Sequence, residues 1–172
     1  SHAKVSVTGG RYVGGLLGYA LSSNIKESYA IGNVDGGPHT GGLIGRMTFH
    51  NNGDGSTLKD SYSTGNVNGG SGSGGLVGSL DRGGIYRSYS TGRVSGKNDG
   101  DKIGGLVGSR GISWSKGEIV NSFFDKDTYG QSGSGKSTSE MQDKSTFTNS
   151  DWDFQNVWEI TPGNYPTLIN NP

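Results

Sequence analysis

One short segment of the chain matches a nucleotide-binding pattern. Gly130 to Ser137 reads GQSGSGKS, which satisfies every fixed position of the phosphate-binding loop GxxxxGK(S/T). Such a loop follows a buried apolar strand and opens a long helix, so that backbone amides face the phosphates. The preceding letters, FFDKDTY, are too polar for a buried strand, and only a short helix is expected afterwards. We therefore predict a chance match in a surface loop, with no nucleotide and no cofactor.

Two further loops collect the oxygen ligands that calcium prefers. Lys97 to Asp101 reads KNDGD and contains Asp99 and Asp101, and residues 51–55 read NNGDG. Neither loop completes the EF-hand pattern with a bidentate glutamate at position twelve, and neither forms the nonapeptide run of calcium-binding solenoids. Asp and Asn are also common turn formers. Turn formation is the favoured interpretation, and Asp99 and Asp101 remain weak calcium candidates.

Carboxylates that could support catalysis are not clustered along the sequence. Enzymes that cleave polysaccharides on a β-helix need paired acidic or clustered basic residues on one face. Asp60, Arg87 and Asn121 occupy or adjoin equivalent repeat positions, but no acidic pair recurs between repeats. Asp151 and Asp153 flank a tryptophan and are expected to face solvent. We predict that this chain is not an enzyme.

Aromatic and arginine side chains in four loops form the candidate ligand-binding site. Aromatic rings stack on sugars, and Tyr, Trp and Arg dominate interface hot spots. The alternative, of equal weight, is that these side chains fold back and shield a corner of the domain. The four loops span residues 19–24, 46–57, 79–84 and 109–118, and the candidate residues are Tyr19, Phe49, Arg110 and Trp114.

The four loops recur because the chain is built from repeats. The block GGLLG at Gly14 returns as GGLIG at Gly41 and as GGLVG at Gly74 and Gly104, and a partner segment of the type SYSTGxV follows each of the first three blocks. Successive copies lie 27 to 34 residues apart. A period in this range is typical of a repeat array.

Aligning the copies produces apolar columns that predict short strands. Each apolar segment is short, bounded by glycine and rich in β-branched and aromatic residues. We predict an all-β parallel β-solenoid of about four coils with about three strands per coil, in which paired glycines provide positive φ and close backbone approach at corners. The columns are Leu16/Leu43/Leu76/Leu106, Leu17/Ile44/Val77/Val107, Ile25/Leu58/Ile85/Ile119, Tyr29/Tyr62/Tyr89/Phe123 and Val7/Val34/Val67/Val94.

The carboxyl-terminal part departs from the repeat pattern. Ser137 and Glu140 form a capping box, which predicts a short helix through about Lys144. Aromatic residues then concentrate between Trp152 and Tyr165. We expect a solenoid over residues 1–128 and, in the same folding unit, a C-terminal cap over 129–172 that contains a short helix and aromatic-rich strands and closes the open end of the stack.

Composition limits the possible partners. The chain has 15 basic and 15 acidic residues and a formal net charge of zero, so no large basic face for nucleic acid is expected. No apolar run approaches the length of a membrane span, and no insertion into a membrane is expected. The sequence starts in the middle of a repeat and shows no signal peptide. We therefore expect a fragment that is joined to neighbouring domains of a larger protein.

The GGL(L/I/V)G blocks and SYSTGxV segments resemble the GLUG repeat of bacterial and archaeal surface proteins. The resemblance covers nearly the whole chain and implies a secreted or cell-surface location. Such repeats occur in adhesins like filamentous haemagglutinin and in non-catalytic parts of immunoglobulin A peptidases, whose HExxH motif this chain lacks. We predict a non-catalytic adhesin segment that binds an extracellular glycan or protein. A structural spacer without ligand is the alternative, and a polysaccharide-acting enzyme is the third hypothesis.

Overall fold

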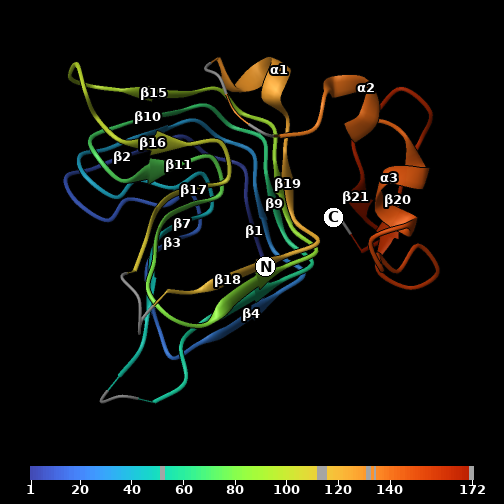
Figure 1. Ribbon diagram of the computed structural model, residues 1–172, viewed down its shortest axis with the longest axis horizontal. Coiled ribbons are helices and arrows are strands. Elements are labelled where there is room, and N and C mark those ends of the chain that lie inside the picture. The colour runs from blue at the N-terminus through green and yellow to red at the C-terminus, as the bar shows by residue number, and fades with distance from the viewer. Residues whose placement is uncertain (51–52, 112–115, 131–132, 134, 171–172) are drawn as a thin grey trace.

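The computed structural model describes residues 1–172 except 51–52, 112–115, 131–132, 134 and 171–172. Short parallel strands stack into coils, and a C-terminal segment of short helices and turns lies along one side of the stack (Figure 1). The predicted parallel β-solenoid of about four turns is confirmed.

Five parallel sheets run along the stack, and each coil adds a strand to most of them. Sheet A contains β1 (His2–Ala3), β5 (Tyr29–Ala30), β9 (Tyr62–Ser63), β14 (Tyr89–Ser90) and β19 (Phe123–Phe124). Sheet B contains β2 (Val7–Thr8), β6 (Val34–Asp35), β10 (Val67–Gly69) and β15 (Val94–Gly96). Sheet C contains β11 (Ser73–Gly74) and β16 (Ile103–Gly104). Sheet D contains β3 (Leu17–Leu21), β7 (Ile44–Thr48), β12 (Val77–Leu80) and β17 (Val107–Arg110), and sheet E contains β4 (Asn24–Lys26), β8 (Thr57–Lys59), β13 (Gly84–Tyr86) and β18 (Glu118–Val120).

The strand register confirms the predicted columns. Val77 pairs with Ile44 on one side and with Val107 on the other, and Tyr89 pairs in the same way with Tyr62 and Phe123. Each coil nevertheless contains four or five short strands where about three were expected. The difference arises because sheets A, B, D and E each take one strand from every coil, and in two coils the glycine block adds a fifth strand in sheet C.

A narrow apolar core fills the interior of the coils. Leu76 and the side chains above and below it in the same column are almost fully excluded from solvent. Small residues complete this core on the sheet A side: Ser63 and Ser90 point inward and donate their hydroxyls to the carbonyls of Gly75 and Gly105, at 2.6 and 2.7 Å. The serines therefore fasten sheet A to the glycine corner on the opposite side of the coil.

The paired glycines are required for close backbone approach and not for positive φ. A Cβ on Gly41 or Gly74 would overlap the carbonyl oxygen of Ile44 or Val77, three residues further on. Neither glycine has a positive φ. The expectation that these glycines supply positive φ was wrong, because the left-handed corners of the coils lie at other positions, most of which carry residues with side chains.

Left-handed backbone conformation recurs at the corner between sheets E and A. Glu27, Asp60, Arg87 and Asn121 occupy equivalent positions in successive coils, with φ between 43° and 49°. Asp and Asn tolerate this region, whereas Glu and Arg are strained there. The repeated backbone geometry shows that coil stacking imposes the corner whatever side chain occupies it.

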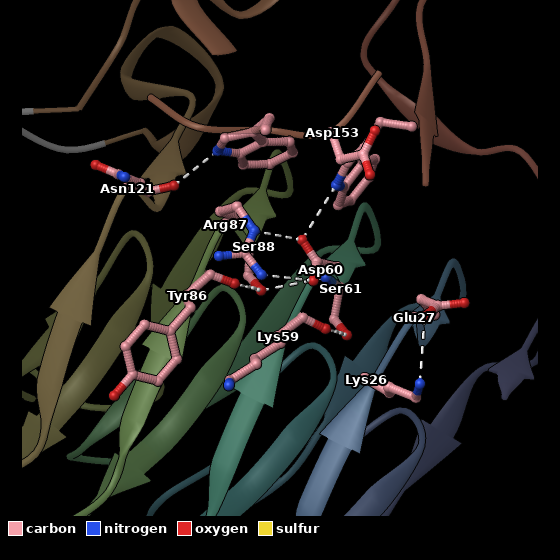
Figure 2. A network of polar contacts seen from close by, with 12 residues as sticks. Lys26, Glu27, Lys59, Asp60, Ser61, Tyr86, Arg87, Ser88, Asn121 and Asp153 are labelled. Atoms are coloured by element: carbon pink, nitrogen blue, oxygen red, sulfur yellow. Dashed lines mark hydrogen bonds and ion pairs between the residues drawn. The ribbon is translucent and has the colours of Figure 1, made fainter. Parts of the chain in front are cut away.

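A serine ladder follows this corner and explains the serine of the SY motif. The amide of Ser61 donates to Ser88 Oγ at 3.2 Å, and the hydroxyl of each serine donates to the carbonyl two residues earlier, that of Lys59 at 2.7 Å and that of Tyr86 at 2.8 Å (Figure 2). Buried backbone amides at a sharp corner need a partner. The hydroxyl of the next coil supplies it.

The C-terminal segment covers the outer face of sheet A. Tyr29, Tyr62 and Tyr89 point away from the inner core and form a second core with this segment, in which Trp158 is fully buried. We expected the segment to close the end of the stack, but it lies chiefly along the side, because the tyrosine column faces outward and must be covered. The segment consists of α1 (Lys126–Tyr129), α2 (Thr138–Met141), α3 (Lys144–Thr148) and the antiparallel pair β20 (Trp158–Glu159) and β21 (Thr167–Leu168).

The start of this segment also differs in detail from the expectation. Asp125 caps α1 by accepting the amide of Asp127 at 2.8 Å, so helical structure begins just before the expected boundary at residue 129. The capping box of Ser137 and Glu140 is present as predicted. It opens α2, and a second short helix follows it, where one helix was expected.

Candidate functional site

The predicted site residues lie where the strands of sheet D end and the loops to sheet E begin. Tyr19 is on β3 and Arg110 is on β17, so the expectation that they are loop residues was wrong, because these strands continue past the predicted starts of the loops. Strands β3, β7, β12 and β17 end side by side in parallel register, and β4, β8, β13 and β18 begin side by side in the same way. The connecting loops therefore share one corner of the solenoid, as predicted. Trp114 lies outside the described residues.

The alternate column of sheet D carries a tyrosine, an arginine and two serines in its four coils. Tyr19, Arg46, Ser79 and Ser109 pair in register along the stack. The next residues along three of these strands, Ala20, Met47 and Leu80, point into the core and are buried. Alternation along a strand explains this, since successive side chains face opposite sides. Tyr19 is 49% exposed.

A column that contains two rings lies beside the column of Tyr19 and Arg46. Tyr12 and His39 occupy equivalent corner positions with φ of 57° and 60°, and their rings stack with centroids 5.4 Å apart. The Tyr12 ring meets that of Tyr19 edge-on at 5.7 Å. Gly72 takes the same corner position one coil further, where a Cβ would collide with the His39 imidazole. The absent side chain makes room for the histidine ring.

Arg46 connects the two columns. Its Nη1 donates to the Tyr12 hydroxyl at 2.9 Å, its Nε donates to Asp81 Oδ2 at 2.9 Å, and its Nη2 lies 2.7 Å from the same oxygen. Its guanidinium carbon is 5.3 Å from the centre of the Tyr12 ring. Contacts on both sides fix the guanidinium, so little side-chain freedom would be lost when a ligand binds.

A groove of about 520 Å³ lies beside these rings, and Arg46, Asp81 and His39 are among its lining residues. Arg11 forms part of its wall, with its guanidinium 4.6 Å from the centre of the Tyr12 ring. Phe49 is a half-buried wall residue that lies under the guanidinium of Arg82, at 4.4 Å. Cation–π contacts of this kind are favourable and hold the rings in place.

Arg110 lies at the rim of the groove in an unexpected register. It pairs with Leu80, a residue of the inward column, and therefore stands at the last position of a core column. Its Nε donates to the carbonyl of Gly117 at 3.1 Å, which turns the guanidinium toward the loop. Arg110 borders both this groove and a more apolar cavity of about 560 Å³ at the last coil, which Leu106 and Phe124 help to line.

The groove has a positive local field. Burial lowers the pKa of His39 below its ordinary value, and the charges of Arg11 and Arg46 lower it further, while Asp81 opposes them. The imidazole Nδ1 lies 3.4 Å from Ser109 Oγ. His39 is therefore expected to be neutral at pH 7 and available for hydrogen bonding.

The structure thus brings three of the four predicted residues to one region. Tyr19 belongs to the cluster of rings, Phe49 lines the groove, and Arg110 lies at its rim. Sequence reasoning missed Arg11, Tyr12, His39 and Arg46. Tyr12 and His39 each stand two residues before a GG block, which was the available signal.

The weak calcium candidates belong to a turn. Asp101 Oδ2 accepts the amide of Asn98 at 2.9 Å and the side-chain amide of the same residue at 3.3 Å. The carboxylate therefore stabilises the turn that contains Asp99. Among the described residues, no group of three or more histidine or acidic side chains is arranged to hold a metal ion.

The described part of the Gly130 to Ser137 segment has a short helix on either side. Helix α1 precedes it, and Gly130 ends that helix with φ 83°. Ser137 caps the four-residue helix α2, and Lys136 Nζ lies 3.5 Å from Glu140 Oε1. The buried strand and long helix that flank a phosphate-binding loop are not found at these positions.

The charged cluster at the corner between sheets E and A supports packing. Arg87 makes two hydrogen bonds to Asp60, at 2.8 and 2.9 Å, and the Trp158 indole nitrogen lies 3.4 Å from Asp60 Oδ1 (Figure 2). The Trp152 indole donates to the carbonyl of Asn121 at 2.9 Å. Each polar contact fastens an indole of the C-terminal segment to the solenoid.

Comparison with known proteins agrees with the repeat interpretation. Residues 9–35 match the family model described as the GLUG motif, which is typical of surface or secreted repeat domains. A region of 88 residues is 40% identical to a protein of Evansella cellulosilytica whose name describes it as a Gly-rich membrane protein. The match covers 49% of this chain and 10% of that protein.

Two further findings complete the comparison. No solved structure matches the chain. Within the described part of the chain, no helix has the length and apolar character needed to cross a membrane.

Proposed function

We propose that the domain is a non-catalytic attachment module of a larger secreted or cell-surface protein, and that it binds an extracellular ligand through the groove on sheet D. One observation carries the proposal: the tyrosine column of sheet A is covered by the chain itself, whereas the rings and arginines of sheet D remain accessible, with Tyr19 half exposed. Exposed aromatic groups with adjacent arginines are typical of recognition surfaces.

The comparisons support the surface location. The GLUG motif is found in this chain, and the similar region in Evansella cellulosilytica belongs to a protein named for a membrane. The activity and partners of the whole protein are part of the proposal, because the match covers only 10% of the relative.

A binding screen tests the proposal. The domain is applied to a glycan array and to immobilised matrix proteins, beside a Tyr19→Ala, Phe49→Ala double variant. Tyr86→Ala is the matched control, since it removes an outward-facing ring from sheet E. We expect binding by the wild type and the control and loss of binding by the double variant, with all melting temperatures close together. Absence of binding by folded wild type would contradict the attachment function and favour a spacer without ligand. Binding that the double variant retains would contradict the site on sheet D.

A further inference from the structure

We infer that the sheet D groove selects an acidic glycan, that is, a sugar chain with carboxylate or sulfate groups. This inference rests on the proposed function and specifies its ligand. It follows from three features of the groove and its surroundings: an excess of fixed positive charge, the half-exposed ring of Tyr19 beside it, and a third arginine at its rim.

Positive charge exceeds negative charge along the groove. Arg11, Arg46 and Arg110 line it, and Asp81 is its one acidic residue among the described lining residues. Asp81 is already engaged by Arg46 at 2.7 Å. Within the described part of the chain, no carboxylate forms an ion pair with Arg11, whose guanidinium lies over the Tyr12 ring. An anion at this point would satisfy donors of Arg11 without displacing a protein partner.

The rings and hydroxyls match a sugar better than an extended peptide. Tyr19 offers a half-exposed ring, held edge-on by Tyr12 at 5.7 Å, on which the apolar face of a pyranose could stack. Ser109 continues the same column, is partly exposed and lies 3.4 Å from the His39 imidazole, whereas Ser79 is buried. A hydroxyl group of the ligand could pair with Ser109.

A third arginine lies at the rim of the groove. Arg46 is on β7 and Arg110 on β17, with β12 between them, so the two strands are two spacings of about 4.8 Å apart. Arg110 stands one residue beyond the Arg46 column, and its guanidinium bonds to the carbonyl of Gly117. Arg11 and Arg46 are therefore the main cationic groups for a bound anion, and Arg110 adds positive charge at the rim.

The test compares four polymers of defined charge. Polygalacturonate carries carboxylates, dextran sulfate carries sulfates, dextran is neutral, and polyglutamate is an acidic peptide. Affinity is measured by biolayer interferometry at low and at high salt. We expect the acidic glycans to bind at least about tenfold more tightly than dextran, as charged hydrogen bonds would give, and to weaken as salt rises. The carboxylated and sulfated polymers then show which anion is preferred.

The variants use one arginine of the groove and one distant cation. Arg11→Gln should weaken binding of acidic glycans about tenfold, which is the usual effect of losing a charged hydrogen bond. Lys97→Gln is the control, because Lys97 pairs with Asp35 on sheet B, away from the groove. The His39 imidazole gives a second readout: its pKa, followed by NMR, should rise when an acidic glycan binds and stay unchanged with dextran.

The outcomes separate this inference from the proposed function. Tight binding of dextran that Tyr19→Ala abolishes would keep the attachment function and overturn the acidic ligand. Polyglutamate binding as tight as that of the glycans would overturn the choice of a sugar. Acidic glycans that bind Arg11→Gln as well as the wild type would overturn the site. Lack of binding to any polymer, glycan or matrix protein would overturn the proposed function itself.

Discussion

Two outer faces of the same solenoid carry aromatic residues, and they differ in whether the C-terminal segment covers them. On sheet A, a tyrosine recurs at the same position in three coils, and the column is buried under the C-terminal segment. On sheet D, the outward column changes from Tyr19 to Arg46, Ser79 and Ser109, and no segment of the described chain packs over it as the C-terminal segment packs over sheet A. Residues that hold one coil to the next repeat along the stack. The sheet D column starts with a ring and a guanidinium that do not repeat, and it is the column for which we propose a role in ligand binding.

The largest difference in stability is expected when one ring is removed from each face in turn. Tyr89 is 1% exposed and packs against Trp152 and Trp158, so Tyr89→Ala should lower the free energy of unfolding by about 3 to 5 kcal/mol. Tyr19→Ala should change it by less than about 0.5 kcal/mol, since surface substitutions rarely matter more. Urea unfolding followed by tryptophan fluorescence measures both. Equal losses would mean that the two faces are equally structural.

Alkaline pH should destabilise the covered face. Burial raises the pKa of Tyr62 from its usual 10.0 to about 12, with a further contribution from Tyr29, and burial raises that of Tyr89 as well. The pKa is higher in the folded state, so the stability is intact below pH 10 and is lost as pH rises from 10 toward 12. A shift of this size corresponds to about 2 to 3 kcal/mol for Tyr62.

Urea midpoints measured between pH 9 and 12 test this expectation, with tyrosinate absorbance recorded in parallel. Tyr62→Phe keeps the ring and removes the ionisable hydroxyl, so its alkaline loss should be smaller than that of the wild type. A variant that loses as much stability as the wild type would show that Tyr62 is not responsible.

Removing a charge at the covered corner should cost less than removing a ring. Asp60→Asn weakens two charged hydrogen bonds to Arg87 and the contact with the Trp158 indole, in a site where Asp60 is mostly buried. We expect a loss of about 1 to 3 kcal/mol, the usual effect of leaving a buried charged partner unsatisfied. Asp35→Asn is the control. The ion pair of Asp35 with Lys97 is solvent-exposed, so its loss should leave the free energy of unfolding unchanged within measurement error. Similar melting temperatures for Asp60→Asn and the control would rule out a structural role for the pair.

The smallest effect is a gain of stability at the same corner. Glu27 has φ 45°, a strained value for a glutamate, and its contact with Lys26 is exposed and long at 3.8 Å. Asn121 holds the equivalent position without this penalty, because Asn tolerates the left-handed region. Glu27→Asn should therefore stabilise the domain by about 0.5 kcal/mol, part of the usual strain at such a residue. A drop in the denaturation midpoint would show that Glu27 makes a favourable contact.

The solenoid and its register could be predicted because they depend on repetition. Each apolar column returns in every coil, and hydrogen bonding between coils then places its members in line. The orientation of sheet A was harder to predict. Tyr62 looked like a core residue, but Ser63 is the one that points inward, since its small side chain fits the narrow coil and bonds to Gly75. The aromatic residues of the C-terminal segment therefore cover the side of the stack.

The candidate site was predicted only in part, because its residues do not repeat from coil to coil. Tyr19, Phe49 and Arg110 were found because they are aromatic or cationic residues in segments assigned to loops of unequal length, although Tyr19 and Arg110 lie at the ends of strands. Arg46 and His39 were missed because nothing in their coil repeats them, and only strand register brings Arg46 beside Tyr19 and Tyr12. A side chain such as Arg46, which contacts residues of a neighbouring coil, leaves no periodic pattern in the sequence.

The C-terminal segment also affects how the domain would respond to pulling. A stack of repeats whose coils touch only their neighbours can unravel one coil at a time from an end. Here Trp158 packs on Tyr62 and Tyr89, while Phe147 contacts Phe123 in the following coil. The segment therefore connects successive coils, and under tension these coils would rupture together as one mechanical unit.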